Sequence, residues 1–98
     1  MSTYLVLFNW TDQGIRDVKG APARVRQVMA GAAAGQRTKI LSWHLTMGQY
    51  DAAVMMEAPD DEAMVASALA LGAQGNVRTT TLKAFTLDEF EKMVAALP

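Results

Sequence analysis

Residues 38–58 read TKILSWHLTMGQYDAAVMMEA, two runs rich in β-branched, aromatic and aliphatic residues on either side of Gly48-Gln49. Runs of this composition are typical of β-strands, and glycine at the first position of a two-residue loop favours a type II′ turn. We therefore expect strands over 38–47 and 50–58, joined as a tight antiparallel hairpin. The segments on either side of this hairpin decide what it pairs with.

The flanking segments predict two more strands and three helices. Strand-like runs cover 3–10 and 76–85, each rich in β-branched, aromatic or aliphatic residues. Apolar residues at three- and four-residue spacing predict helices over 21–35, 59–72 and 86–97, the last opened by the capping-box sequence TLDE. The order along the chain is strand, helix, strand, strand, helix, strand, helix.

This order predicts a ferredoxin-like α+β domain over residues 1–98. Two right-handed strand-helix-strand units joined by a hairpin give a four-stranded antiparallel sheet. The first strand then pairs with the third and fourth, and the second strand pairs with the third. Two of the helices cover one face of the sheet, and the C-terminal helix is an addition to this core.

Both faces of the predicted sheet are apolar. The first strand carries Tyr4, Val6, Phe8 and Trp10 on one side and Leu5 and Leu7 on the other, and the third strand has Ala52, Val54 and Met56 backed by Ala53 and Met55. A face exposed to water would show polar residues at every second position. The C-terminal helix could cover the second face, but one short helix rarely covers four strands. We therefore expect a homodimer that packs sheet against sheet, with higher oligomers as a further alternative.

Composition excludes several classes of partner. Apolar residues make up 51% of the chain, charged residues make up 19%, the formal net charge is −1, and cysteine is missing. So small a charge supplies no field that would attract nucleic acid or an anionic membrane. Histidines and carboxylates are not spaced as metal ligands, and no glycine-rich phosphate loop occurs. We expect a cytoplasmic protein with no metal or cofactor.

Several short segments resemble a known family. Gly48, Tyr50 and Asp51, with Gln49 intervening, match the glycine, tyrosine and aspartate signature of the GYD domain family. The segments 9–11, 58–62 and 75–82 are also similar to family segments, in the family's order. The resemblance covers roughly residues 3–90 and implies a dimeric α+β barrel, a superfamily that includes cofactor-free monooxygenases, isomerases, haem-handling proteins and ligand-sensing modules. It implies an architecture but no particular activity.

The predicted topology brings three distant segments to one edge of the sheet. The residues collected there are Asn9, Trp10, Thr46, Tyr50, Asp51, Asn76 and Arg78. Binding residues often gather at one end of a rigid scaffold. The leading hypothesis is a homodimeric module that binds a small organic molecule, of aromatic or carbonyl character, between the sheet and its helices.

A cofactor-free isomerase, lyase or oxygenase is the first alternative. In the predicted hairpin Thr46 pairs with Asp51, which leaves His44 diagonal to Asp51 on the same face. His44 and Asp51 could then transfer a proton, while Arg78 or Asn9 steadies an oxyanion. In the simpler interpretation His44 is a packing residue, Asp51 bonds backbone amides of the turn and Arg78 forms an ion pair. A structural protein that binds partners is the third alternative.

Overall fold

The computed structural model describes residues 1–31 and 37–98 of the chain. Its elements are β1 (Ser2–Trp10), α1 (Asp12–Arg16), the 3-10 helix η1 (Val18–Gly20), α2 (Ala21–Met29), β2 (Lys39–Leu45), β3 (Ala52–Ala58), α3 (Asp61–Ala73), β4 (Val77–Ala84) and α4 (Leu87–Ala95). The predicted α+β fold is confirmed, with α1 and η1 as helical turns that the sequence had not revealed. The predicted first helix is shorter than expected, because α2 ends at Met29, and residues 32–36 lie outside the described part.

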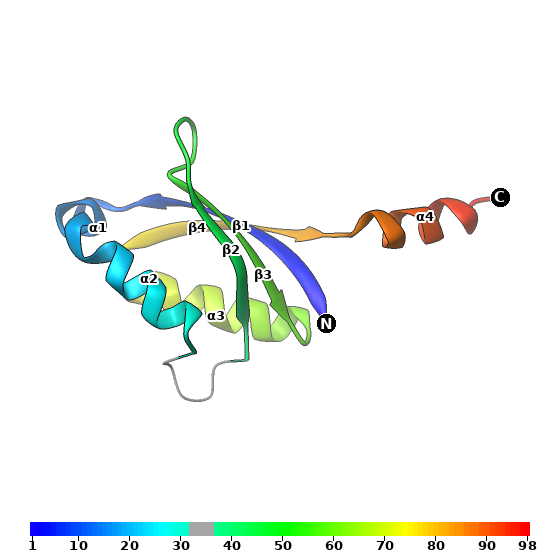
Figure 1. Cartoon of the computed structure of the whole chain (residues 1–98), viewed down its shortest axis with the longest axis horizontal. Helices are drawn as coiled ribbons and strands as arrows, with labels where there is room; N and C mark the ends of the chain where they lie inside the picture. The colour runs from blue at the N-terminus through cyan, green and yellow to red at the C-terminus, as the bar shows by residue number, and fades with distance from the viewer. Residues whose placement is uncertain (32–36) are drawn as a thin grey trace.

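The four strands form one antiparallel sheet in the predicted order, β2-β3-β1-β4. Helices α2 and α3 lie together on one face of it (Figure 1). Tyr4, Val6 and Phe8 alternate toward these helices along β1 and are buried, at 3%, 3% and 6% exposure. The core therefore lies between the helices and one set of alternating side chains, as the apolar pattern predicts.

An irregularity in β2 changes which of its residues face the helices. Ile40 pairs with Met56 and Trp43 pairs with Val54, with a register shift between Ile40 and Ser42. A bulge of this kind inserts one extra residue, here in the Ile40–Ser42 segment, and reverses the alternation beyond it. Ile40 and Trp43 therefore both pack against the core although they are three residues apart.

The hairpin between β2 and β3 is wider than predicted. The strands end at Leu45 and resume at Ala52, so a two-residue turn is wrong and the loop spans residues 46–51. The predicted pairing of Thr46 with Asp51 is present, since the Thr46 N–H donates to the Asp51 carbonyl at 2.9 Å. The Thr46 hydroxyl also donates to the Tyr50 carbonyl at 2.6 Å, which holds the wider loop.

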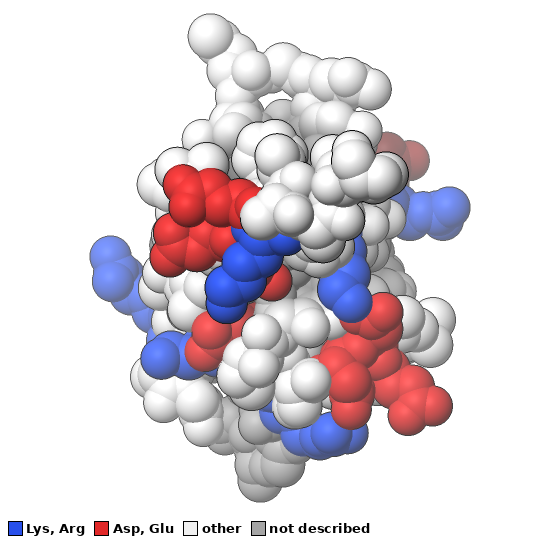
Figure 2. Space-filling view, turned by 90° about the vertical axis from the view of Figure 1, so that its right-hand side faces the viewer, with Lys and Arg blue, Asp and Glu red and all other residues white. Residues whose placement is uncertain are grey.

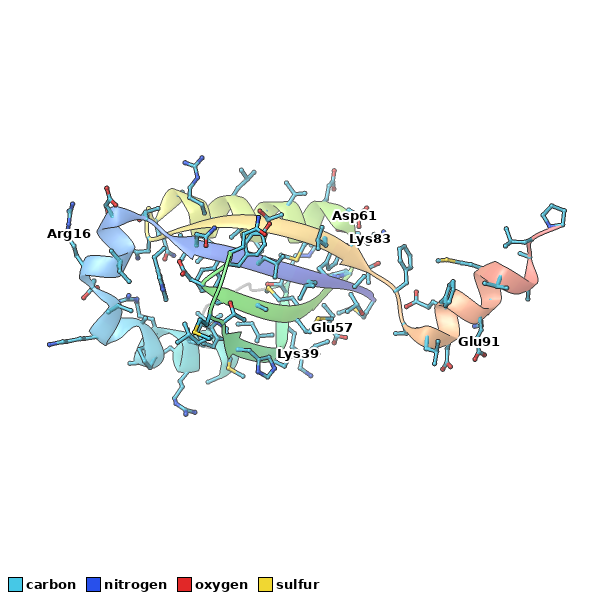
Figure 3. The ribbon with its side chains drawn as sticks, turned by 90° about the horizontal axis from the view of Figure 1, so that it is seen from above. Arg16, Lys39, Glu57, Asp61, Lys83 and Glu91 are labelled. Carbon is cyan, nitrogen blue, oxygen red and sulfur yellow. The ribbon has the colours of Figure 1, made fainter. Side chains whose placement is uncertain are left out.

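The sheet face opposite the helices, here called the open face, has no cover among the described residues. Leu5 stands between Met55 and Leu82 on this face, and Leu7 stands between Ala53 and Thr80. Helix α4 lies beyond the end of the sheet instead of folding across it (Figures 1 and 3). Its apolar side chains are exposed as well.

Helix α4 begins with the predicted capping box. The Thr86 hydroxyl accepts from the Glu89 N–H at 3.1 Å, and the Glu89 carboxylate accepts from the Thr86 N–H at 3.0 Å. The hydrogen bond that the Thr86 N–H donates to the carboxylate is the main cause that lowers the pKa of Glu89. The helix start is thus locally determined, although the helix itself lies beyond the end of the sheet.

A charged cluster fixes the start of α3 to the sheet. The Tyr4 hydroxyl donates to Asp61 Oδ1 at 2.5 Å, and Lys83 Nζ lies 3.0 Å from the same oxygen (Figure 3). The hydrogen bond from Tyr4, followed by that from Lys83, lowers the pKa of Asp61. The same contacts to Asp61 raise the pKa of Tyr4 and of Lys83. All three groups are joined at the end of the sheet where β1 begins and β4 ends.

Candidate functional site: a cavity between the sheet and helices α2 and α3

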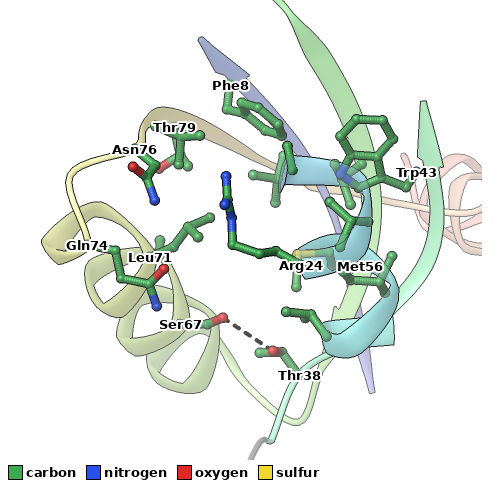
Figure 4. A pocket seen from close by; sticks show the side chains of 18 of the residues that line it. Phe8, Arg24, Thr38, Trp43, Met56, Ser67, Leu71, Gln74, Asn76 and Thr79 are labelled. Atoms are coloured by element: carbon green, nitrogen blue, oxygen red, sulfur yellow. Dashed lines mark hydrogen bonds between the residues drawn. The ribbon is translucent and has the colours of Figure 1, made fainter. Parts of the chain in front are cut away.

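A cavity of about 190 Å³ lies between the helix-covered face of the sheet and helices α2 and α3 (Figure 4). Its walls are mainly apolar, and they include Phe8, Trp10, Trp43, Val54 and Met56. The Phe8 ring stands edge-on to Trp10, with centroids 5.1 Å apart, and 6.1 Å from Trp43. The cavity exceeds the roughly 150 Å³ of an engineered apolar cavity that binds benzene, so a small aromatic molecule fits inside.

Arg24 of α2 extends across the mouth of the cavity (Figure 4). Its guanidinium forms an ion pair with Asp17, with Nη1 2.8 Å from Oδ2. Gly20 leaves room for this arrangement, because a Cβ there would stand 2.9 Å from Arg24 Nη1. The short α1-η1 segment therefore positions a cation beside an apolar cavity.

Polar side chains also line the cavity between the start of β2 and α3. The hydroxyls of Thr38 and Ser67, which both line it, lie 3.2 Å apart and form a hydrogen bond between the start of β2 and α3. Thr38 is 7% exposed, and it is the buried polar residue of the described core. One hydroxyl donates to the other, so the buried Thr38 side chain has a hydrogen-bond partner.

On the side of the cavity opposite to Thr38 and Ser67, hydrogen bonds join the segment around Thr11 to the segment around Asn76. The Thr11 N–H donates to the Asn76 carbonyl at 3.1 Å, and the Thr11 hydroxyl donates to the Gly75 carbonyl. Gly14 packs against the same stretch of backbone, since a Cβ there would lie 1.9 Å from the Asn76 oxygen. The sequence segments 9–11 and 75–82 therefore meet, as predicted, with Gly14 as the contact that permits it.

Gln13 fixes the orientation of the Asn76 side chain. Gln13 Nε2 donates to the Gln74 carbonyl at 3.0 Å and to Asn76 Oδ1 at 3.1 Å. A backbone carbonyl only accepts, so the Gln13 atom bonded to it is the amide nitrogen, and the Asn76 atom that accepts from this nitrogen is the oxygen. The Asn76 amide nitrogen is then turned toward the cavity (Figure 4).

The structure divides the predicted site residues between the two faces of the sheet. Trp10 and Asn76 line the cavity. Asn9 and Arg78 are cross-strand partners in β1 and β4, in the alternate set that faces away from the helices. Thr46 and Tyr50 belong to the hairpin loop. These residues do lie at one edge of the sheet, but only Trp10 and Asn76 among them line the cavity.

His44 and Asp51 lie outside the lining of the cavity. His44 pairs with Ala53 in β2 and is exposed on the open-face side. The Asp51 carboxylate accepts from the Trp10 N–H at 2.9 Å, and the Asp51 N–H donates to the Phe8 carbonyl at 2.9 Å. Asp51 therefore holds the end of β1: its carboxylate bonds a backbone amide, as in the simpler interpretation, but that amide belongs to β1 and not to the turn.

Sequence reasoning missed several residues in or beside the cavity: Gln13, Arg24, Thr38, Ser67 and Gln74. A signal for Arg24 was present, because it interrupts the apolar spacing of α2 immediately before Val25. The ion pair with Asp17 depends on the unpredicted turns α1 and η1. Gln13 orients Asn76, which is 63 positions away in the sequence, and local spacing does not reveal a contact of that kind.

Comparison with known proteins shows which family the chain belongs to. The family model described as GYD domain matches residues 4–94. The chain belongs to the GYD domain family. In this GYD domain the signature aspartate is Asp51, which holds Trp10 beside the cavity.

A relative of this GYD domain is the "Glutamine synthetase and cystathionine beta-lyase binding protein" of Thermus thermophilus. The two are 29% identical over 84 residues, which cover 86% of this chain and 88% of the relative. No solved structure matches the chain significantly. In the described residues 1–31 and 37–98, no helix is long and apolar enough to cross a membrane, and no group of three His, Asp or Glu residues could hold a metal ion.

Proposed function

We propose that this GYD domain is a homodimeric module that binds a small organic molecule in the cavity between the sheet and helices α2 and α3. The observation that carries the proposal is the combination of apolar walls with a few polar groups at the mouth, namely Arg24, Gln74 and Asn76. Ligand sites are commonly apolar concavities in which a small number of polar groups fix orientation. The aromatic walls favour an aromatic or flat apolar ligand.

The enzyme alternative receives less support from the same geometry. Proton transfer requires the base to lie within hydrogen-bond reach of the reacting group. His44 is on the other side of the sheet from the cavity, and the Asp51 carboxylate already accepts the Trp10 N–H. A catalytic pair of His44 and Asp51 would therefore need a second site on the open face.

The homodimer is supported by the open face. Leu5 and Leu7 of β1 and Met55 of β3 lie on it, and Leu82 of β4 is 47% exposed. Apolar surface removed from water contributes roughly 25 cal/mol per Å². A second copy presents the same apolar surface, so a two-fold contact covers both open faces at once.

Aromatic probes test the cavity directly. We expect toluene and indole to raise the melting temperature of the protein and to give saturation-transfer signals in ligand-observed NMR. At ten times Kd the stabilisation is about 1.4 kcal/mol, equivalent to several degrees for a domain of this size. Ala68→Phe fills the cavity from α3 and should abolish both effects.

Ala66→Phe is the matched control, because Ala66 lies on the same helix and is exposed. This variant should bind the probes as the wild type does. The cavity is not the ligand site if Ala68→Phe binds as well as the wild type does. Lack of binding by the wild type in a broad metabolite screen would end the proposal.

Binding of another protein is the second candidate function, favoured by the name of the Thermus relative and by helix α4. Phe90, Met93 and Val94 of α4 recur at three- and four-residue spacing and are 57%, 46% and 49% exposed. Figure 2 looks at the side from which α4 projects and shows charges of both signs with uncharged surface between them. An exposed apolar stripe of this kind is a common way to dock a helix into a groove.

The test of this second candidate is to mix the purified protein with glutamine synthetase and with cystathionine β-lyase of the source organism. Co-elution in size-exclusion chromatography, lost in Phe90→Glu and retained in Lys92→Glu, is the result that we expect if α4 binds these enzymes. Lys92 lies on the same helix and is exposed, so it controls for added negative charge. Separate elution of the wild type from both enzymes would exclude them as partners.

A further inference from the structure

We propose that the ligand of the cavity is an aryl or short-chain carboxylate, with its carboxylate held between Arg24 and Asn76 at the mouth and its apolar body inside. This inference rests on the proposed function, because it names the chemical class of the molecule that the cavity binds. Three features carry it: the charge at the mouth, the fixed direction of one amide, and the size of the apolar interior.

The charge at the mouth favours an anion. Among the described lining residues Arg24 alone is charged, and its guanidinium carries only donors. Arg24 makes two hydrogen bonds to Asp17, from Nη1 to the carboxylate at 2.8 Å and from Nη2 to the carbonyl at 3.3 Å. A guanidinium has five N–H groups, so donors remain for a ligand.

Asp17 does not remove the attraction for a second anion. Its side chain is 68% exposed, and that of Arg24 is 40% exposed, so solvent screens their ion pair. A ligand carboxylate on the cavity side of the guanidinium competes with Asp17 for the same cation. Neutralising Asp17 should therefore tighten the binding of a carboxylate.

Asn76 supplies a second donor of known direction. Gln13 Nε2 occupies Asn76 Oδ1 at 3.1 Å, which leaves the amide nitrogen toward the cavity, on the same side as the Arg24 guanidinium (Figure 4). Two donor groups on the same side of the cavity suit the two oxygens of a carboxylate. A ligand with an amine head group would place its own N–H donors against those of Arg24 and Asn76. It would also bring a second positive charge next to Arg24, so this site disfavours an amine.

The interior limits the body of the ligand. The cavity of about 190 Å³ is lined mainly by apolar and aromatic side chains, and the hydrogen-bonded Thr38 and Ser67 also line it. Because about 150 Å³ accommodates benzene, this volume suits one ring with a chain of two or three carbons. A phenylalkanoate therefore represents the class.

The experiment compares 3-phenylpropanoate with 3-phenylpropanamide and 3-phenylpropylamine, which share the body and differ in the head group. Titration calorimetry at pH 7 and low salt should give the carboxylate an affinity roughly 10- to 100-fold above that of the amide, the range expected when the acceptor that faces the guanidinium also becomes charged. The amine should bind more weakly than the amide. Raising the salt concentration should weaken only the carboxylate.

Two variants with opposite expected effects locate the head group. Arg24→Gln should reduce carboxylate affinity to that of the amide and leave amide affinity unchanged. Asp17→Asn should increase carboxylate affinity severalfold, because the guanidinium loses its competing anion. Circular dichroism and thermal unfolding of both variants show whether the fold is kept, and Arg24→Lys, which keeps the charge, should restore part of the preference.

The outcomes separate this inference from the proposed function. Equal affinities of the wild type for carboxylate and amide would overturn the carboxylate class and leave the cavity as a binding site. A carboxylate preference that survives Arg24→Gln would overturn the role of Arg24. Failure of all three probes, together with failure of toluene and indole, would overturn the proposed function as well.

Discussion

Replacing Gly14 with alanine is expected to destabilise the protein by on the order of 3 kcal/mol, as forced overpacking does when backbone must move. The new Cβ would lie 1.9 Å from the Asn76 carbonyl oxygen and 2.8 Å from its carbon. Both are backbone atoms, so no side-chain rotation relieves the contact. The clamp between Thr11 and residues 75–76 has to open, and urea or thermal unfolding measures the loss.

Gly72→Ala is the matched control for this substitution. Gly72 lies in α3, and a Cβ built there meets nothing within 4 Å. Alanine in a helix is more favourable than glycine by roughly 0.5–1 kcal/mol, so this variant should be slightly more stable than the wild type. A Gly14→Ala variant as stable as the wild type would contradict the close packing of α1 on Asn76.

Gly14→Ala should also disturb the cavity. Displacing the Asn76 backbone moves the side chain that Gln13 orients toward the mouth. We therefore expect the Gly14→Ala protein, where it remains folded, to lose part of the preference for a carboxylate over an amide. Gly72→Ala should keep that preference.

Replacing Leu5 with glutamate is expected to raise the dissociation constant of the proposed dimer at least about 100-fold, because it buries uncompensated charge. Leu5 lies between Met55 and Leu82 in the middle of the open face. A two-fold contact places two such glutamates in the interface, one from each copy. Analytical ultracentrifugation at micromolar concentration should show the wild type as a dimer and Leu5→Glu as a single copy.

Leu69→Glu controls for the loss of a leucine and the gain of a charge. Leu69 lies on α3 and is 69% exposed, away from the open face. This variant should remain a dimer. A wild type that sediments as a single copy, or a Leu5→Glu variant that stays dimeric, would exclude the sheet-on-sheet homodimer.

Much of the architecture was predictable because its causes are local. Alternation of apolar residues in β1 assigned Tyr4 and Val6 to one face and Leu5 to the other, and the structure keeps that division. The capping box at Thr86 and Glu89 was also visible in the sequence, since both of its hydrogen bonds join residues three apart. The loop of the hairpin was predicted less well, because bonds from Thr46 and Asp51 widen it.

The candidate site was only partly predictable. Trp10 and Asn76 were named from the convergence of strand ends, and both line the cavity. Arg24 was missed because its direction depends on Asp17 and Gly20 in turns that no apolar spacing marks. The register of the hairpin places His44 on the open face of the sheet rather than in the cavity.

The amino-acid sequence by itself determined the strand and helix order, the split sheet and the apolar alternation of its inner strands, since these follow from periodicity and capping among near neighbours. Only the tertiary structure decided where the cavity lies and which polar groups reach it. Gln13 meets Asn76 across 63 residues, and Thr38 meets Ser67 across 29. Such contacts depend on the packing of whole elements in three dimensions, which no local pattern in the chain encodes.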